Sequence, residues 1–407
     1  MSFRWAAFIA AVGWSCGLAS AQEPRILTLD TAFARALEKH PEIARYSHLR
    51  EAAQASHDAE SQGPPIRVEF DLETDPAELT LSLASAFERG GKREARVALA
   101  DAQLSALVLQ EEQRRVDLLA EVARRYLDFV ATLAMVDLVA TEVTQRETLV
   151  EATAKRVRAG ASPESVHLAA EAALARATLQ RDRLRSETQA AASRLAILWS
   201  SREPDFERGT GNPLSVPATP TLDSLRELIK SSPELRRFAD ESRLREARVQ
   251  LARTSGSSDI EWRAGVRRLE EDGSWAAVVG ISVPLGSGTR SDPRIRAAQS
   301  ELAALSLERE AEELTLEATL VEAHTRLSGA SLAVATTRDV LIPKFEQAER
   351  ASERAFRAGA LTYIEWAQVQ SDVMSVRSEQ LLAAVEAHRA LIEIQRLTGS
   401  SFIRTKP

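Results

Sequence analysis

Cysteine and aromatic residues are scarce in this chain of 407 residues, which has one cysteine and 5% aromatic residues. The cysteine, Cys16, lies within residues 1–21, where Arg4, a short apolar run over Trp5–Trp14 and the sequence Ala-Ser-Ala at 19–21 predict a signal peptide. Removal of this peptide leaves a chain without cysteine, which excludes disulfide bonds and thiol chemistry. We therefore expect an exported protein of bacterial type, with lipid attachment at Cys16 as the less favoured alternative.

Motifs for catalysis and for metal binding are also lacking. The sequence has no glycine-rich phosphate loop, no His-Glu-x-x-His and no local Ser-His-Asp signature, and its six histidines are scattered. The formal net charge is −7, without the clustered Lys and Arg that neutralise phosphates. No run of 18 apolar residues follows the N-terminal segment. These absences predict no enzyme, no cofactor, no metal site, no nucleic-acid partner and no membrane-spanning helix.

An internal duplication is the most informative feature that the sequence does contain. Three short stretches recur in the same order after roughly 200 residues. They are Thr28–Ile43 and Thr221–Leu235, Gly90–Arg93 and Gly286–Arg290, and the two Arg-Ala-Gly-Ala turns at 158–161 and 357–360. The duplication predicts a first repeat over 22–200, a linker rich in proline and glycine over 201–221, a second repeat over 222–399 and a tail over 400–407.

Each repeat is predicted to run through two helices, a strand pair, a very long helix, a tight turn and a shorter helix. In the first repeat, the strand pair is expected over 64–87, the long helix over 92–158, the tip over 158–162 and the shorter helix over 163–199. In the second repeat, the same four elements are expected over 259–285, 291–357, 357–361 and 362–398. The long helix at 92–158 lacks Gly and Pro and would span about 100 Å. Its two apolar stripes with a seven-residue period predict neighbouring helices on both sides. In the second long helix, Pro343 predicts a kink.

The predicted strands Ile66–Glu73, Glu78–Ala84, Ile260–Leu269 and Trp275–Leu285 alternate apolar with polar or charged residues. Apolar residues facing lipid and charged residues facing a lumen are typical of outer-membrane barrels. The predicted lumen residues are Arg67, Glu69, Asp71, Arg263 and Arg267. A water-soluble hairpin with a solvated charged face is the alternative. Four strands leave open edges that lipid does not tolerate, so a membrane-spanning sheet requires several chains; three chains give twelve strands and the beginnings of a lumen.

The two repeated turns are candidate interaction sites. Gly160 and Gly359 stand where a helix ends in a left-handed residue, and Arg158 and Arg357 stand where a cation favours the helix C-terminus. A stable helix hairpin by itself accounts for these residues. The predicted tip residues are Arg158, Ala159, Gly160, Ala161, Arg357, Ala358, Gly359 and Ala360.

Several stretches together resemble a known family. Thr28–Asp30 with Pro41–Glu42, then Gly90–Arg93, and finally Leu341–Gln370 make the chain similar to the TolC-type outer-membrane efflux proteins, and among them to the heavy-metal (cation) efflux branch. The resemblance implies a mainly α protein with a small antiparallel β part. In that fold, four strands per chain contribute to a shared twelve-stranded trimeric barrel, and long helices form a coiled-coil tube.

The resemblance also implies a function, partners and a location. The chain would be the passive, gated exit duct of a tripartite efflux system in the bacterial outer membrane, extending into the periplasm. Its partners would be two further copies in a homotrimer, outer-membrane lipid, a periplasmic adaptor (a membrane fusion protein) at the tips and an inner-membrane pump of the resistance-nodulation-division type. Glu365 would form an acidic ring at the closed aperture, with an ordinary surface carboxylate as the alternative.

A different function stays open on the sequence alone. A periplasmic coiled-coil scaffold or adaptor with soluble hairpins would show the same long helices. The exported substrate also stays open among metal ions, drugs and peptides.

Overall fold

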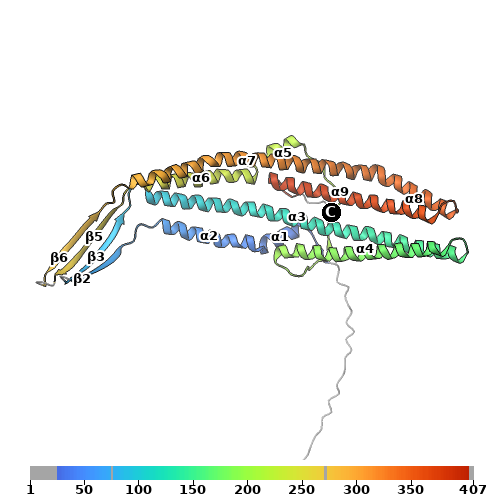
Figure 1. Cartoon of the computed structure of the whole chain (residues 1–407), viewed down its shortest axis with the longest axis horizontal. Coiled ribbons are helices and arrows are strands. Elements are labelled where there is room, and N and C mark those ends of the chain that lie inside the picture. The colour runs from blue at the N-terminus through green and yellow to red at the C-terminus, as the bar shows by residue number, and fades with distance from the viewer. Residues whose placement is uncertain (1–24, 75–76, 270–272, 403–407) are drawn as a thin grey trace, which may run out of the picture.

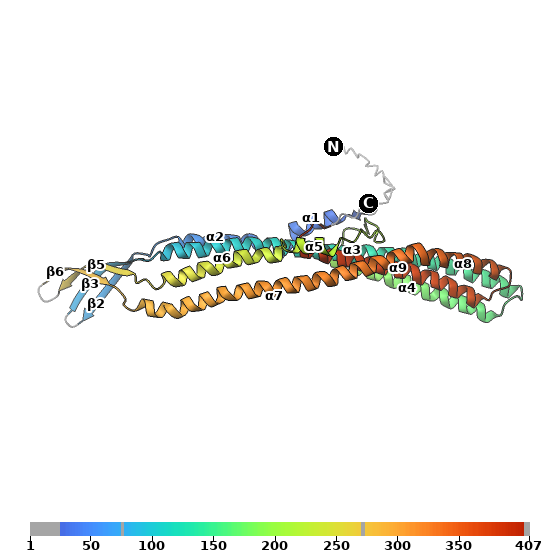
Figure 2. The ribbon, with the colours of Figure 1, turned by 90° about the horizontal axis from the view of Figure 1, so that it is seen from above.

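The computed structural model describes residues 25–74, 77–269 and 273–402. The predicted signal peptide with Cys16, and most of the predicted tail, lie outside the described residues. The molecule is elongated, with helices running side by side along its length, a β-sheet at one end and two helical hairpins at the other (Figure 1). The same arrangement is seen from above in Figure 2. No helix among the described residues is long and apolar enough to cross a membrane.

The first repeat contains, in order, α1 (Leu29–Lys39), α2 (Pro41–Glu60), β2 (Arg67–Thr74), β3 (Ala77–Phe87), α3 (Lys92–Arg158), α4 (Glu164–Ala196) and the 3-10 turn η1 (Ile197–Trp199). The Oγ1 of Thr28 accepts from the N–H of Thr31 and caps α1. His40 separates α1 from α2, which begins at Pro41, because proline suits the first turn of a helix and disfavours helical geometry in the preceding residue. The helix α3 runs without interruption through 67 residues, or about 100 Å.

The second repeat contains α5 (Leu222–Ile229), α6 (Pro233–Thr254), β5 (Ile260–Leu269), β6 (Trp275–Ser282), α7 (Ser287–Thr336), the π turn η2 (Thr337–Leu341), α8 (Ile342–Arg357) and α9 (Tyr363–Thr398). The single helix expected over 291–357 is therefore wrong in two respects: it begins at Ser287, and a π turn divides it. Pro343 explains the division, because its ring lacks an N–H and crowds the carbonyl four residues earlier, and a wider turn relieves both problems.

The four long strands form one antiparallel sheet in the order β2-β3-β5-β6. The central pair β3–β5 joins the two repeats, with Thr80 opposite Arg267 and Ala84 opposite Arg263. The strand β3 is longer than the predicted Glu78–Ala84, because its ladder with β5 continues to Phe87 after its ladder with β2 has ended at Ala84. The strand β6 ends at Ser282, short of the predicted Leu285.

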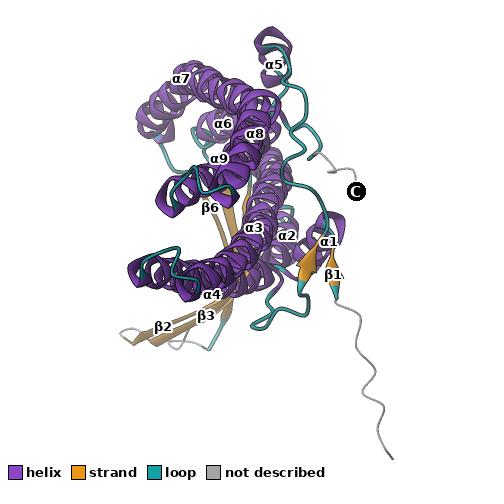
Figure 3. Ribbon diagram, turned by 90° about the vertical axis from the view of Figure 1, so that its right-hand side faces the viewer, coloured by secondary structure: helices purple, strands orange, loops and turns teal. Residues whose placement is uncertain are grey.

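The helices form a curved wall that is open on one side when viewed from the hairpin end (Figure 3). The helix α3 packs against α4, α6 and α9, and α9 packs against α7 and α8. Buried apolar clusters lie between α1, α3 and α4, between α5, α6, α7 and α9, and between α3 and α9. Neighbours on more than one side of α3 agree with its two apolar stripes.

The linker 201–221 packs across the middle of the molecule. It contains a short strand, β4 (Arg208–Gly209), which pairs in parallel with β1 (Ile26–Leu27). The Oη of Tyr126 on α3 lies 2.9 Å from the carbonyl of Leu27 and accepts from the N–H of Thr210 at 2.9 Å, so one side chain ties both short strands to the wall. The sequence did not predict β1 or β4, since strands of two residues leave no alternating pattern.

Candidate functional surfaces: the sheet, the hairpin tips and the seam between repeats

One face of the sheet is apolar and exposed. Cross-strand partners share a face, so the register places the apolar residues of all four strands together. They include Val68, Phe70, Leu72, Leu81, Leu83, Phe87, Trp262, Val266, Trp275, Val279 and Ile281. Individual exposure reaches 69% for Val68 and 78% for Val279. Ser85 and the exposed Arg268 also lie on this face. The apolar surface around them is of a kind that marks contact with lipid or with another protein.

The opposite face of the sheet gathers the five predicted lumen residues. A guanidinium nitrogen of Arg263 lies 3.7 Å from Glu69 and 3.9 Å from Asp71, and Arg67 lies 3.9 Å from Glu69. Arg267 pairs with Glu78 at 2.7 Å and donates to Thr80 at 3.1 Å. Sequence reasoning missed Glu78, which the pairing of β3 with β5 brings to Arg267. The structure thus places these residues on one face, while their position in a lumen stays a prediction.

The sheet has two unpaired edges. Within the described residues, β2 pairs only with β3 and β6 pairs only with β5. Both edges expose rows of backbone N–H and C=O groups, which is a template for pairing with another chain.

Both predicted tips are formed as expected from their local sequence. Gly160 and Gly359 have φ values of 69° and 76°, in the left-handed region. The N–H of Ala161 donates to the carbonyl of Arg156 at 2.9 Å, and the N–H of Ala360 donates to the carbonyl of Ala355 at 2.9 Å. These bonds close a Schellman turn at each helix end. All eight predicted tip residues, Arg158, Ala159, Gly160, Ala161, Arg357, Ala358, Gly359 and Ala360, are exposed.

A contact between the two tips was not predicted, and it depends on Arg156. Its Nη1 donates to the carbonyl of Phe356 at 3.3 Å, and its guanidinium lies 4.8 Å from the centre of the Phe356 ring. Its Nε donates to Ser162 in its own hairpin at 3.2 Å. Phe356 also stacks on Trp366 at 4.6 Å and is buried with Leu149 of α3. We call this contact the tip clasp. In the sequence, the signal for this contact was that the second repeat has Ala355 at the position where the first repeat has Arg156.

Glu365 caps the helix α9. Its carboxylate accepts from the N–H of Thr362 at 2.9 Å and from the Thr362 hydroxyl at 2.6 Å, while its own N–H donates to that hydroxyl. The hydrogen bonds from Thr362 lower the pKa of Glu365. This direction is opposite to the increase expected for close like charges in an acidic ring. The single chain therefore gives Glu365 a capping role, and its role at an aperture stays a prediction.

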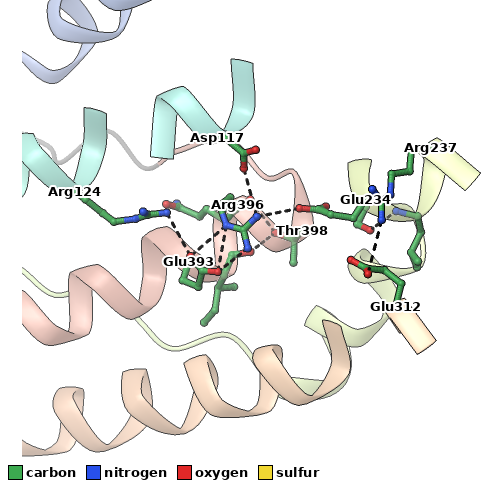
Figure 4. Close-up of polar contacts among 12 residues, drawn as sticks. Asp117, Arg124, Glu234, Arg237, Glu312, Glu393, Arg396 and Thr398 are labelled. Carbon is green, nitrogen blue, oxygen red and sulfur yellow. Dashed lines mark hydrogen bonds and ion pairs between the residues drawn. The ribbon is translucent and has the colours of Figure 1, made fainter. Parts of the chain in front are cut away.

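Three ion pairs join α3 of the first repeat to α9 of the second. Asp117 lies 3.4 Å from Arg396, Arg124 lies 3.5 Å from Glu393, and Asp128 lies 2.7 Å from Arg389. We call these three pairs the seam ladder. Its first two pairs are shown in Figure 4.

Arg396 is the centre of a wider network (Figure 4). It binds Glu393 at 2.7 Å and Glu234 of α6 at 3.2 Å. Burial raises the pKa of Glu234, and its second carboxylate oxygen has no hydrogen-bond partner. Burial opposes ionisation of Glu393 as well, but the hydrogen bond and charge of Arg396 lower its pKa overall. The network thus couples α3, α6 and α9 near the middle of the molecule.

A groove of about 740 Å³ separates α3 and α4 from α9 between the seam ladder and the tips. Its lining includes Met135, Glu142 and Arg146 of α3, and Met374 and Glu379 of α9. Within the described residues, no group of three or more His, Cys, Asp or Glu side chains is arranged to hold a metal ion.

Comparison with known proteins identifies the relatives of this chain. The family model described as "Outer membrane efflux protein" matches residues 224–400. The cobalt-zinc-cadmium resistance protein CzcC of Cupriavidus metallidurans is 25% identical over 312 residues, which are 77% of this chain and 75% of CzcC. The nickel and cobalt resistance protein CnrC of the same organism is 28% identical over 237 residues, or 56% of each chain.

A solved structure with a similar fold is the outer membrane protein VceC of Vibrio cholerae. It has a TM-score of 0.72 and 16% identity, over 92% of this chain and 97% of VceC. The resemblance to TolC-type outer-membrane efflux proteins of the heavy-metal branch is therefore confirmed, and so is the fold of long helices with a small antiparallel sheet.

Proposed function

We propose, for a chain that is similar to the outer membrane efflux proteins in sequence and fold, that it is the exit duct of a tripartite efflux system. It is a passive, gated channel in the bacterial outer membrane that extends into the periplasm. Three copies form the channel, with their sheets in the membrane and their helices as a periplasmic tube.

The observation that carries this proposal is the four-stranded sheet. Its exposed apolar face and its charged opposite face match a membrane strand layer with a polar interior. Its two open edges exclude a single chain in lipid, where each unpaired backbone group costs several kcal/mol. Pairing β2 of one copy with β6 of the next closes a barrel of twelve strands and leaves Arg67, Glu69, Asp71, Arg263 and Arg267 in its lumen.

The tips are proposed as the docking site of a periplasmic adaptor. Eight exposed residues in two left-handed turns lie at the end of the rod opposite the sheet. An inner-membrane pump of the resistance-nodulation-division type supplies the energy for transport. The similarity to two metal-resistance proteins supports divalent metal cations as cargo.

The aperture is proposed to lie at the same end. The tip clasp holds the α8–α9 hairpin against α3, and Glu365 lies in the first turn of α9 beside it. In a trimer three copies of Glu365 come together at the mouth and favour cations.

Membrane fractionation and planar-bilayer recording together test this function. We expect the mature protein in the outer-membrane fraction, as a trimer that dissociates on heating in detergent, with low and cation-selective conductance. Recovery as a soluble periplasmic protein without channel activity contradicts the duct and supports the scaffold alternative.

A further inference from the structure

One arginine lies on the apolar face of the sheet. Arg268 on β5 is exposed and stands between Leu79 on β3 and Trp275 on β6. Among the paired residues that the structure describes, it is the only charged residue on this face. Arg263 and Arg267 point to the opposite face of the same strand and pair with carboxylates there. Arg268 has no ion-pair partner among the described residues.

The position of Arg268 is at the edge of the apolar face. Ile260, at the helix end of β5, lies about 27 Å from Arg268 along the strand. At a strand tilt of about 40°, this length covers about 21 Å across a membrane, against an apolar band about 25 Å tall in barrels. The described residues in the rows between them are all apolar except Ser85. Arg268 therefore lies at a boundary of the apolar band.

The direction of the sheet decides which boundary this is. Arg268 lies one residue before the end of β5, and β5 ends away from the helices (Figure 1). Under the proposed function the helices extend into the periplasm, so this end of the sheet faces the outside of the cell. The outer leaflet of a bacterial outer membrane is built largely from lipid A, whose disaccharide headgroup carries phosphate groups.

The side chains at this boundary suit such a headgroup. A guanidinium group donates two parallel hydrogen bonds to a phosphate, and its apolar stem can remain in the apolar band while the charge reaches the headgroups. The neighbouring Trp275 is 66% exposed, and tryptophan is typical of the level where lipid tails meet headgroups. An unpaired cation on a lipid-facing surface is unfavourable, and an anionic headgroup supplies the missing partner.

We propose that Arg268, with Trp275 beside it, is a binding site for a phosphate group of lipid A in the outer leaflet. This inference rests on the proposed function, since the orientation of the sheet in the outer membrane follows from it. Three copies of the chain give three such sites around the barrel. Each site fixes the depth of the barrel in the membrane and adds stability that depends on this lipid.

Lipid binding to the purified trimer tests the site. Trimers are extracted from outer membranes, freed of bound lipid by detergent exchange, and titrated with diphosphoryl lipid A or with dephosphorylated lipid A in native mass spectrometry. The variants are Arg268→Gln, which removes the charge, and Arg268→Lys, which keeps the charge without the paired donors. The matched control, Arg263→Gln, removes an arginine of the same strand from the opposite face.

We expect the wild type to bind diphosphoryl lipid A about tenfold more tightly than dephosphorylated lipid A, because hydrogen bonds between charged groups are the strong ones. Arg268→Gln should lose this preference, Arg268→Lys should keep part of it, and Arg263→Gln should match the wild type. Equal binding of the two lipids by the wild type, or an unchanged preference in Arg268→Gln, overturns the site.

Thermal dissociation of the same trimers gives a second readout. Diphosphoryl lipid A should raise the dissociation temperature of the wild type more than that of Arg268→Gln. A loss of stability in Arg268→Gln that is equal with and without this lipid shows that Arg268 acts within the protein, and it overturns the site. Wild-type trimers in the outer membrane without a phosphate preference contradict this inference alone, whereas the absence of such trimers contradicts the proposed function.

Discussion

The two repeats of this chain have the same order of elements but differ at three matched places. The first repeat has an unbroken long helix, Arg156 before its tip and Val166 after it. The second has a π turn, Ala355 and Glu365 at the corresponding positions. Both repeats contribute helices to the wall and a tip. The differences give the first repeat an unbroken long helix with a clasp, and the second a long helix that a π turn divides. Under the proposed function, the shared features form the duct, and we propose that the differences form its gate.

The largest effect is expected from a variant that lacks both tip glycines, a feature that the two repeats share. Gly160→Pro combined with Gly359→Pro cannot keep positive φ values, because proline is fixed near −65°. We expect adaptor cross-linking and metal resistance to fall to background while trimers remain in the outer membrane. The matched control, Gly160→Ala with Gly359→Ala, introduces less strain and should keep partial docking. Full resistance in the proline variant contradicts tip docking.

The next largest effect is expected from a variant that removes one of the differences between the repeats, the arginine at position 156. Arg156→Ala gives the first tip the residue of the second and breaks the bond to Phe356. We expect single-channel conductance to rise several-fold, because the hairpin of the second repeat loses its polar attachment. Arg158→Ala removes a neighbouring arginine that is not part of the clasp and should leave conductance unchanged. Equal responses of the two variants rule out a specific clasp.

Variants at Glu365 and Thr362 distinguish a role of Glu365 in capping α9 from a role in gating the aperture. Glu365→Lys should alter both conductance and cation selectivity, whereas Thr362→Ala removes the capping hydroxyl and should change thermal stability alone. The lowered pKa of Glu365 means that its capping contribution is present above its unfolded pKa and is lost as pH falls through the folded pKa. Unchanged conductance and selectivity in Glu365→Lys exclude a role at the aperture.

The network around Arg396 predicts opposite responses from Glu393 and Glu234, two carboxylates that bind this arginine. Glu393→Gln should destabilise the trimer by about 2 kcal/mol at neutral pH, since it weakens charge-assisted bonds to Arg396. Because the pKa of Glu393 is lowered in the folded protein, this contribution to stability is present at pH values above the unfolded pKa. It is lost as the pH falls through the folded pKa.

Glu234→Gln should instead stabilise the protein at neutral pH. Burial raises the pKa of Glu234, so ionisation costs stability as pH rises from the unfolded to the folded pKa, and glutamine removes that cost. Denaturant unfolding between pH 4 and 8 measures both variants. Destabilisation by both at neutral pH shows that Glu234 is a net favourable partner of Arg396.

The smallest effect is expected from a variant that removes a glycine in the long helix of the second repeat. Gly329 lies inside α7 with open space at its Cβ position, and the aligned stretch of α3 has no glycine. Gly329→Ala should stabilise the protein by about 0.5 to 1 kcal/mol. Thermal unfolding of the variant measures this gain, and a loss of stability means that the site lacks room for a methyl group.

The sequence was sufficient to predict those elements that are determined by residues close together in the chain. The range of α3 follows from the absence of Gly and Pro, and both tips follow from a glycine at a helix end. Contacts between the repeats were not predictable in this way. The clasp of Arg156 and the pairing of Arg267 with Glu78 depend on how distant segments meet. The π turn was missed because Pro343 marks a disturbance of the helix without specifying its form.

Pairing of the open sheet edges between copies is the central claim, and cysteine cross-linking tests it most directly. Glu69→Cys on β2 is combined in turn with Ala276→Cys, Val278→Cys or Gly280→Cys on β6, which lie on the same face of the sheet. At least one combination should give covalent dimers and trimers in denaturing gels of outer membranes, with no larger species. Monomers alone in all three combinations, or a ladder that continues beyond three chains, contradict a closed barrel shared by three copies.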